Sequence, residues 1–126
     1  MKNYLFAVLL ILFSCQKENV NTYSIEIYGN DNCAYTTKLR NECTKLNIDF
    51  QYFSVANADN HNKARDLATK FSLGQVFTLE GTVNGIPFTS NSLSFNYPIV
   101  QVKFNDEIYG LERPNIESIK NIIQLK

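Results

Sequence analysis

The sequence lacks the features that mark several common classes of protein. Acidic and basic residues number 12 each, so the 126-residue chain has no net charge and no electrostatic footprint for nucleic acid. Its three cysteines are an odd number, which does not suit a closed disulfide framework. Internal repeats and low-complexity tracts are absent. What remains is the length of one globular domain, sufficient to bury a core.

Spacings typical of a metal site are also lacking. Cys33 and His61 are the only reactive pair of soft ligands, and nothing supplies tetrahedral spacing around them. His61 stands between Asn60 and Asn62 at the start of an expected helix, which favours a solvated surface position. We therefore expect neither a metal nor a resident cofactor.

An apolar run stands at the N-terminus. Lys2 precedes apolar residues 4–13, a pattern typical of a signal peptide and too short to span a membrane comfortably. The run ends in LFSC, which resembles the lipobox of bacterial lipoproteins, although its second residue, Phe13, is bulkier than usual. The resemblance implies a signal peptide over 1–15 and lipidation of Cys15. The alternative is an ordinary secretory signal in which Cys15 is incidental.

The lipoprotein pattern also predicts a location. More than one acyl chain anchors a protein stably, because each buried CH₂ contributes about 0.8 kcal/mol. We therefore expect a membrane anchor through Cys15 at the bacterial cell envelope, facing the periplasm or the cell surface. Residues 16–22 are typical of a polar tether, and a domain over 23–126 follows.

The first half of this domain alternates between strand and helix patterns. Residues 23–29 and 47–55 are rich in β-branched and aromatic residues and predict strands. Apolar residues at helical spacing predict a helix over 35–46 and another capped by Asn57 or Asp59. The resulting β-α-β-α order favours a parallel pair of strands.

The second half predicts two strands and a helix. Residues 98–104 predict a strand that turns directly into a short antiparallel one within 105–110. A helix then begins at Pro114 or Asn115, with an isoleucine stripe along one face.

An insertion of about 73–95 separates the two halves. Asn84-Gly85 tolerates the positive φ angles of a tight hairpin turn, and Pro87 confines its strand to an edge. We expect a hairpin or a long ordered loop here. Its apolar residues offer an edge for a partner strand; alternatively, the hairpin covers the edge of the main sheet.

The order of these elements, with a cysteine after the first strand, resembles the thioredoxin fold and within it the glutaredoxin family. Three segments carry the resemblance, which covers about 23–72 and 96–124: IYGNDNCAYT, YPIVQV and YGLERPNIESI. It implies an α/β, thioredoxin-like fold of the glutaredoxin type. A mixed four-stranded sheet would be flanked by helices, with the insertion before the third core strand. Pro98 would be cis and would face Cys33.

The chain departs from the glutaredoxin pattern at the motif itself. Thr36 replaces the second cysteine, and Asn30 stands where a basic residue is common. With Asn30 in place of a cation, binding of a carboxylate should be weak. The segment Asn96-Tyr97-Pro98 replaces the usual Thr-Val-Pro, and the double glycine is Tyr109-Gly110.

Cys33 stands where a helix begins, which favours its reactive form. The first turn of a helix leaves N–H groups unpaired and carries about half a positive charge, which stabilises a thiolate. Asp31 should oppose this effect, and no Lys or Arg stands beside Cys33 in the sequence. We therefore expect a modest lowering of the pKa of Cys33.

The resemblance implies an exported monothiol thiol–disulfide oxidoreductase acting on protein or glutathione mixed disulfides. Cys33 would be the nucleophile, and glutathione or another small thiol would release it as co-substrate. Seven residues would bind this substrate: Tyr35, Thr36, Tyr97, Pro98, Gly110, Leu111 and Glu112. The last three of these would lie near the turn into the final helix.

Several alternatives remain open. Cys33 could be inert in a non-catalytic thioredoxin-fold binding module at the cell envelope. Cys43 could resolve Cys33, but ten helical residues rise about 15 Å, against the limit of about 7 Å between the Cα atoms of a disulfide. A buried apolar role for Cys43 is therefore favoured. Monothiol glutaredoxins can share an iron–sulfur cluster between protomers, for which an exported protein is poorly suited.

Overall fold

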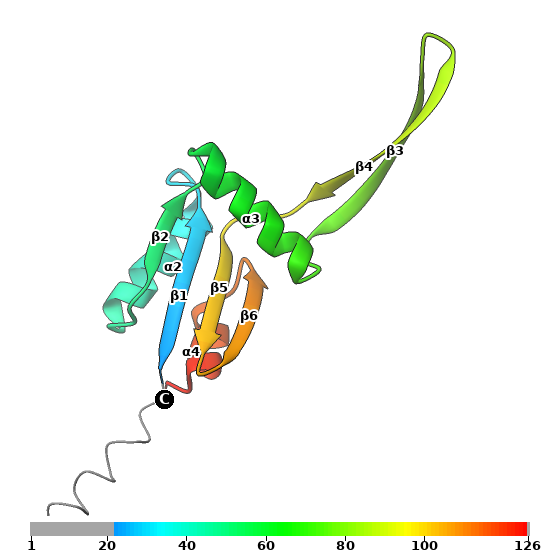
Figure 1. Cartoon of the computed structure of the whole chain (residues 1–126). Coiled ribbons are helices and arrows are strands. Elements are labelled where there is room, and N and C mark those ends of the chain that lie inside the picture. The colour runs from blue at the N-terminus through cyan, green and yellow to red at the C-terminus, as the bar shows by residue number, and fades with distance from the viewer. Residues whose placement is uncertain (1–21, 126) are drawn as a thin grey trace, which may run out of the picture.

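The computed structural model of the chain describes residues 22–125. The predicted signal peptide, the lipidation of Cys15 and the tether residues 16–21 lie outside the described residues. The elements are β1 (Tyr23–Gly29), α2 (Ala34–Lys45), β2 (Gln51–Ser54), α3 (Ala58–Lys70), β3 (Gln75–Val83), β4 (Ile86–Ser94), β5 (Ile99–Phe104), β6 (Glu107–Glu112) and α4 (Ile116–Ile123) (Figure 1). Within 22–125, no helix has both the length and the apolar character needed to cross a membrane.

The protein has a mixed α/β fold built on a four-stranded sheet in the order β2-β1-β5-β6. Strand β1 is parallel to β2 and antiparallel to β5, and β6 is antiparallel to β5. Helices α2 and α4 lie behind the sheet in Figure 1, and α3 crosses its front. The predicted strand and helix types of the main sheet are confirmed, including the parallel pair.

The larger core lies between the sheet and helices α2 and α4. Alternation along β1 and β5 turns Ile25, Ile27, Val100 and Val102 to this face, since successive strand residues point to opposite sides. Helical spacing brings apolar residues of α2 and α4 onto them: Leu39, Cys43, Ile119 and Ile123. Cys43 is 0% exposed, which confirms its interpretation as a buried apolar residue. Burial raises the pKa of Cys43 to about 11, so it stays a thiol at neutral pH.

The opposite face of the sheet is covered by α3. Ala64 and Ala68 are fully buried against Tyr28 and Ile99, and their small size lets the helix approach the strands closely. The predicted caps are also present: the Asn57 side chain accepts hydrogen bonds at the start of α3, as Asn115 does for α4.

Two predicted boundaries are wrong. Strand β2 begins at Gln51 because the residues before it close α2: Asn47 has a φ of 54°, and Ile48 N–H donates to the Cys43 carbonyl at 2.9 Å. At the other end, β6 continues to Glu112, where its pairing with Ile99 of β5 holds the chain extended. Residues 110–112 are therefore strand residues, and the turn into α4 comes after them.

The insertion is a hairpin that stands clear of the domain. Strands β3 and β4 pair only with each other along nine residues each, and Asn84 and Gly85 turn between them with φ angles of 52° and 79°. The hairpin projects from the side of the domain near the end of α3 (Figure 1). It is therefore neither a long loop nor a cover for the edge of the main sheet, and those two expectations are wrong.

Candidate functional site

The site is centred on Cys33, which begins α2. The chain leaves β1 at Gly29 and turns tightly, since Asn32 N–H donates to the Asn30 side chain and Cys33 N–H donates to the Asn30 carbonyl, both at 3.0 Å. Cys33 is the N-cap residue, but its side chain makes no capping bond. The half-buried sulfur is therefore left beside the N–H groups of the first helical turn.

A second segment reaches Cys33 from the other half of the chain. The Tyr97–Pro98 peptide bond is cis, as expected, and Pro98 is buried immediately before β5. The Cys33 thiol donates a long hydrogen bond to the Tyr97 carbonyl, with Sγ 3.9 Å from the oxygen. The site is therefore formed by the pairing of β1 with β5, which brings the ends of both strands together.

Arg113 completes the site and was missed in the sequence. Its Nε donates to the Tyr97 carbonyl at 2.9 Å, and its backbone N–H donates to the Pro98 carbonyl at 2.7 Å. Its guanidinium lies 4.0 Å from the centre of the Tyr35 ring, a cation–π contact. Arg113 thus links Tyr35 and Tyr97, and its positive charge acts on Cys33 although no Lys or Arg stands beside Cys33 in the sequence.

Contrary to expectation, Asp31 does not oppose the Cys33 thiolate, because its carboxylate contacts two other side chains. The Tyr52 hydroxyl donates to Asp31 at 2.7 Å, and an Arg40 nitrogen lies 3.7 Å from the same carboxylate. The Arg40 guanidinium also stacks 3.8 Å above the Tyr52 ring. This group holds the carboxylate against β2.

The pKa of Cys33 is lowered from its usual value. The largest cause is the backbone N–H of Thr36, and the Thr36 hydroxyl, the Tyr35 N–H and the positive charge of Arg113 act in the same direction. Partial burial opposes them and keeps the effect moderate. Because the folded pKa lies below the unfolded one, the thiolate stabilises the folded state above an unfolded pKa of about 8.5, and this contribution is lost as pH falls through the folded pKa.

Thr36 has an unusual environment for a polar residue. It is 0% exposed, and its hydroxyl oxygen has no hydrogen-bond partner within the described chain. A buried hydroxyl without a partner costs about 1–3 kcal/mol. The Thr36 hydroxyl lowers the pKa of Cys33, so a Cys33 thiolate would be a suitable acceptor for it.

We expect Thr36→Val to separate stability from reactivity. Valine keeps the shape and removes the unpaired hydroxyl, so the free energy of unfolding at pH 6 should stay equal or rise by about 1 kcal/mol. The pKa of Cys33 should rise because one donor to the thiolate is lost. Thr36→Ser is the matched control: it keeps the hydroxyl and should keep the lowered pKa. Urea unfolding and thiol titration measure the two effects, and a valine variant with an unchanged pKa would contradict this role.

The residues expected to bind a small thiol fall into two groups. The first lies around Cys33 and consists of Tyr35, Thr36, Tyr97 and Pro98. The second lies in β6. Glu112 reaches the site segment by accepting a hydrogen bond from Asn96 N–H at 2.7 Å.

The other two residues of β6 have structural neighbours. Leu111 packs against the larger core. The space beside Gly110 is filled by the Phe71 side chain at the end of α3, so no Cβ fits there. Among the three β6 residues, only Glu112 therefore contacts the segment that leads to Pro98.

Contrary to expectation, His61 is not simply a solvated surface residue. It is half-buried, its Nδ1 lies 2.7 Å from the Tyr97 hydroxyl, and its Nε2 lies 3.5 Å from an Arg65 nitrogen. It therefore helps to fix Tyr97, whose carbonyl faces Cys33. Within 22–125, no three His, Cys, Asp or Glu side chains gather as a metal site would require.

Cys33 also opens onto a shallow groove along α2. Residues on one side of the helix line it, among them Asn32, Thr37, Lys38 and Asn41. Another hollow lies between the β5–β6 turn and α4, at the far end of the sheet from Cys33. Cys33 itself is one of the residues that line this groove.

Comparison with known proteins adds no identification. No protein-family model matches the sequence, and neither the curated proteins nor the solved structures include a significant match.

Proposed function

We propose that the chain is a glutaredoxin-like monothiol thiol–disulfide oxidoreductase with a thioredoxin-like fold. Cys33 acts as nucleophile on protein or glutathione mixed disulfides. The protein is exported and anchored at the bacterial cell envelope through a lipid on Cys15. The observation that carries the proposal is the environment of Cys33: a sulfur at a helix start, beside a cis Tyr97–Pro98 bond, with a buried Thr36 hydroxyl that lacks an acceptor.

The topology supports the fold assignment. The sheet order β2-β1-β5-β6, with only the β1–β2 pair parallel, agrees with the fold that the motifs resemble. The cysteine follows β1, and the cis proline precedes β5. In this interpretation β3 and β4 are an insertion between two halves that otherwise follow the glutaredoxin order.

The reaction consists of two exchanges. The Cys33 thiolate attacks one sulfur of a mixed disulfide, a new S–S bond forms, and the other sulfur leaves as a thiolate that takes up a proton. A small thiol such as glutathione then attacks the Cys33 disulfide as its thiolate. This step forms a disulfide between the small thiol and the group carried on Cys33, which is oxidised glutathione when both are glutathione, and it regenerates the Cys33 thiolate. The donors around Cys33 stabilise the thiolate both before attack and after release.

An external thiol must release Cys33 from its mixed disulfide, because Cys43 is not in a position to do so. That residue is 0% exposed in the core, and burial holds its pKa well above neutral pH, so it supplies no attacking thiolate. Thr36 occupies the place where a two-cysteine motif has its second sulfur, and a hydroxyl cannot form a disulfide.

Trapping of the intermediate tests the proposal. The protein is incubated with oxidised glutathione near neutral pH, and the modified peptides are mapped by mass spectrometry. We expect one glutathione on Cys33 and none on Cys43, with release by added reduced glutathione. A protein that acquires no adduct on Cys33 would contradict the proposal.

A second candidate function is favoured by the exposed hairpin. A non-catalytic binding module at the cell envelope would use the apolar side chains of β3 and β4 and would need no reactive sulfur. The two candidates differ at Cys33→Ser: the binding module keeps its partner, and the enzyme loses its activity.

A further inference from the structure

We propose that the β3–β4 hairpin is a self-association arm that packs face to face against the same hairpin of a second copy of the chain. The inference concerns a surface away from Cys33 and does not depend on the thiol chemistry. It rests on the distribution of side chains over the two faces of the hairpin, on its free edges and on the direction in which it projects.

One face of the hairpin is predominantly apolar from the Phe77–Ser92 row to the turn. Alternation along the paired strands places five large apolar side chains on this face: Phe77, Leu79, Val83, Ile86 and Phe88. Their exposed fractions run from 43% for Phe88 to 70% for Ile86. The remaining residues of this face between the first and last of these rows are a glycine and two serines, so it carries no charge.

The other face has a different character. Thr78, Glu80 and Thr82 lie on it, and the Thr78 hydroxyl donates to Asn91 across the strands at 3.1 Å. At the base of the hairpin this face turns toward the end of α3, where Val76 and Leu93 line a hollow together with residues of that helix. The apolar face therefore points away from α3 at the base and is left uncovered.

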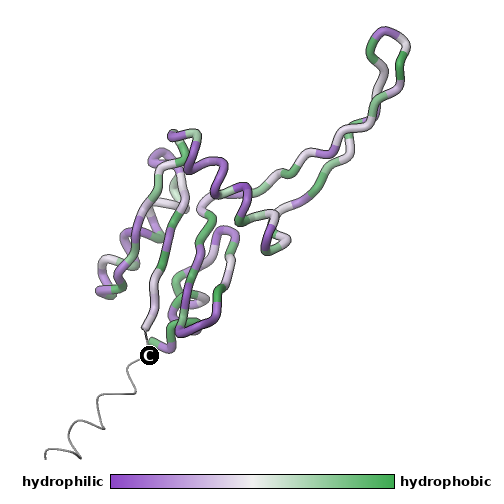
Figure 2. The backbone as a smooth tube through the Cα atoms, viewed as in Figure 1, coloured by the Kyte–Doolittle hydropathy of each residue, from purple (hydrophilic) through white to green (hydrophobic). Residues whose placement is uncertain are grey.

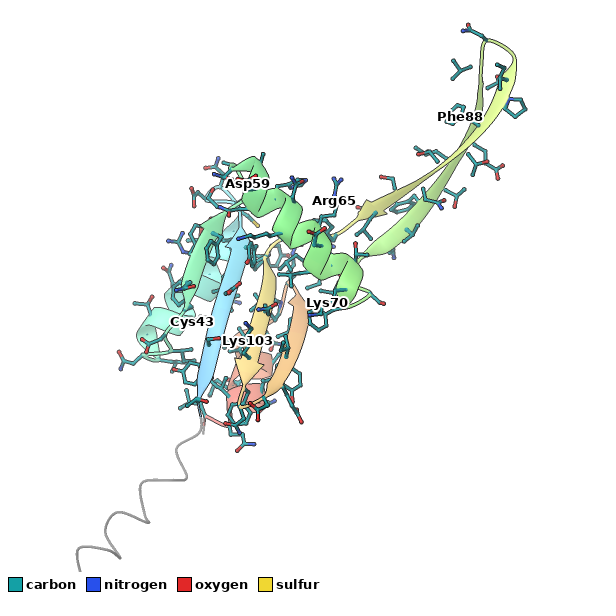
Figure 3. All side chains as sticks on the ribbon, in the orientation of Figure 1. Cys43, Asp59, Arg65, Lys70, Phe88 and Lys103 are labelled. Carbon is teal, nitrogen blue, oxygen red and sulfur yellow. The ribbon has the colours of Figure 1, made fainter. Side chains whose placement is uncertain are left out.

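The area of the apolar face suits a dimer better than an isolated monomer. The five side chains expose on the order of 500 Å² in one copy, which is at the upper end for monomeric proteins. Two copies in contact would bury roughly 1,000 Å², close to the lower limit for specific association. Figure 2 shows apolar residues along the arm far from the domain, and Figure 3 shows Phe88 well out along it.

The rows of the apolar face are complementary to themselves. In two successive rows a large residue stands opposite a small one, Phe77 with Ser92 and Leu79 with Ser90. In the next row the Phe88 ring already lies over Gly81 of its own hairpin. A two-fold axis parallel to the strands places β3 of one copy over β4 of the other at the same height. Phe77 and Leu79 then face the serines of their own rows in the partner, in a self-complementary arrangement of the kind that an isologous interface requires.

The strand edges favour face-to-face packing over strand addition. The two-residue turn makes Val83 and Ile86 a hydrogen-bonded pair, so the next pair, Thr82 and Pro87, is a non-hydrogen-bonded one. The backbone nitrogen of Pro87 therefore faces outward and has no hydrogen to donate. This interrupts the donors along the free edge of β4 and hinders a partner strand there.

The direction of the arm also suits a second copy. The chain enters β1 at the end of the domain opposite the hairpin (Figure 1). An axis along the arm places the start of β1 of both copies at the same end of the pair. Two copies anchored in one membrane would need this arrangement, with the paired arms directed away from it.

The test uses two tagged forms of the full chain produced in the same cells. After solubilisation, one tag is captured and the other is quantified. We expect wild-type copies to co-purify and Leu79→Lys to reduce recovery at least tenfold, because it places a charge in the apolar face. Thr82→Lys is the matched control: it adds the same charge to the same strand on the polar face and should co-purify like wild type.

Three outcomes would overturn the inference. If wild-type copies do not co-purify, the apolar face does not bind a second copy and would instead contact a lipid surface or a different polypeptide. Leu79→Lys recovered as well as wild type would show that shared micelles, and not the arm, hold the copies together. Equal loss in Thr82→Lys would show that any charge on the arm is disruptive. Because Leu79 is 58% exposed, its substitution should leave the fold intact, which circular dichroism checks.

Discussion

Replacement of Cys33 by serine should abolish thiol–disulfide exchange and leave the fold intact. The hydroxyl of serine is not ionised near neutral pH and cannot form a disulfide, so the rate should fall by about 100-fold or more, to the level without protein. The thiol makes only a long hydrogen bond, with Sγ 3.9 Å from the Tyr97 oxygen, and stability should therefore change little. Reduction of a glutathionylated peptide by glutathione measures the activity, and urea unfolding measures the stability.

Cys43→Ala is the matched control for this substitution. It removes a fully buried sulfur from the core and should lower the free energy of unfolding by about 1 kcal/mol while leaving the exchange rate intact. The two cysteines should therefore show opposite patterns of activity and stability. If exchange activity survives in Cys33→Ser but is lost in Cys43→Ala, the chemistry belongs to Cys43, and the proposed site is refuted.

Gly29→Ala should add a strongly disruptive methyl group next to the site. A Cβ at this position would lie 2.5 Å from Cγ2 and 2.6 Å from Oγ1 of Thr36, well inside van der Waals contact. Both residues are buried, so the clash cannot be relieved toward solvent. We expect a loss of about 2–3 kcal/mol in the free energy of unfolding, the range typical of overpacked cores. Displacement of Thr36 should also raise the pKa of Cys33.

A double mutant isolates the cause of this loss. Thr36→Ala removes both atoms that the new methyl group would strike, and the nearest remaining atom, Thr36 Cβ, would lie at 3.1 Å. In the Gly29→Ala/Thr36→Ala variant, the two substitutions should therefore be less destabilising than the sum of the single effects, by about 1 kcal/mol or more. Simple additivity would show that Gly29 is needed for another reason, such as its backbone conformation.

Local patterns predicted most of the elements because each depends on neighbouring residues. The caps Asn57 and Asn115 begin α3 and α4, and Asn84-Gly85 forms the hairpin turn, where predicted. The buried apolar role expected of Cys43 in α2 is confirmed. Strand ends were less predictable, because the length of β6 depends on its pairing with β5.

Contacts between distant segments could not be predicted in this way. Arg113 acts on Cys33 only after β5 and β6 pair, and nothing near either residue in the sequence indicates the contact. Asp31 was expected to oppose the thiolate because its partners, Arg40 and Tyr52, lie on other elements. The hairpin pattern specified two strands and a turn, but not whether they would join the main sheet.

The rate of alkylation of Cys33 by iodoacetamide as a function of pH tests the proposed site most directly. The Cys33 peptide is followed by mass spectrometry in the folded protein, so that Cys43 does not contribute. We expect a midpoint clearly below about 8.5, the value of an ordinary thiol, and a shift back toward that value in Thr36→Val. A wild-type midpoint at or above about 8.5, or no reaction while the protein is folded, would contradict an activated Cys33 and leave the binding module as the better proposal.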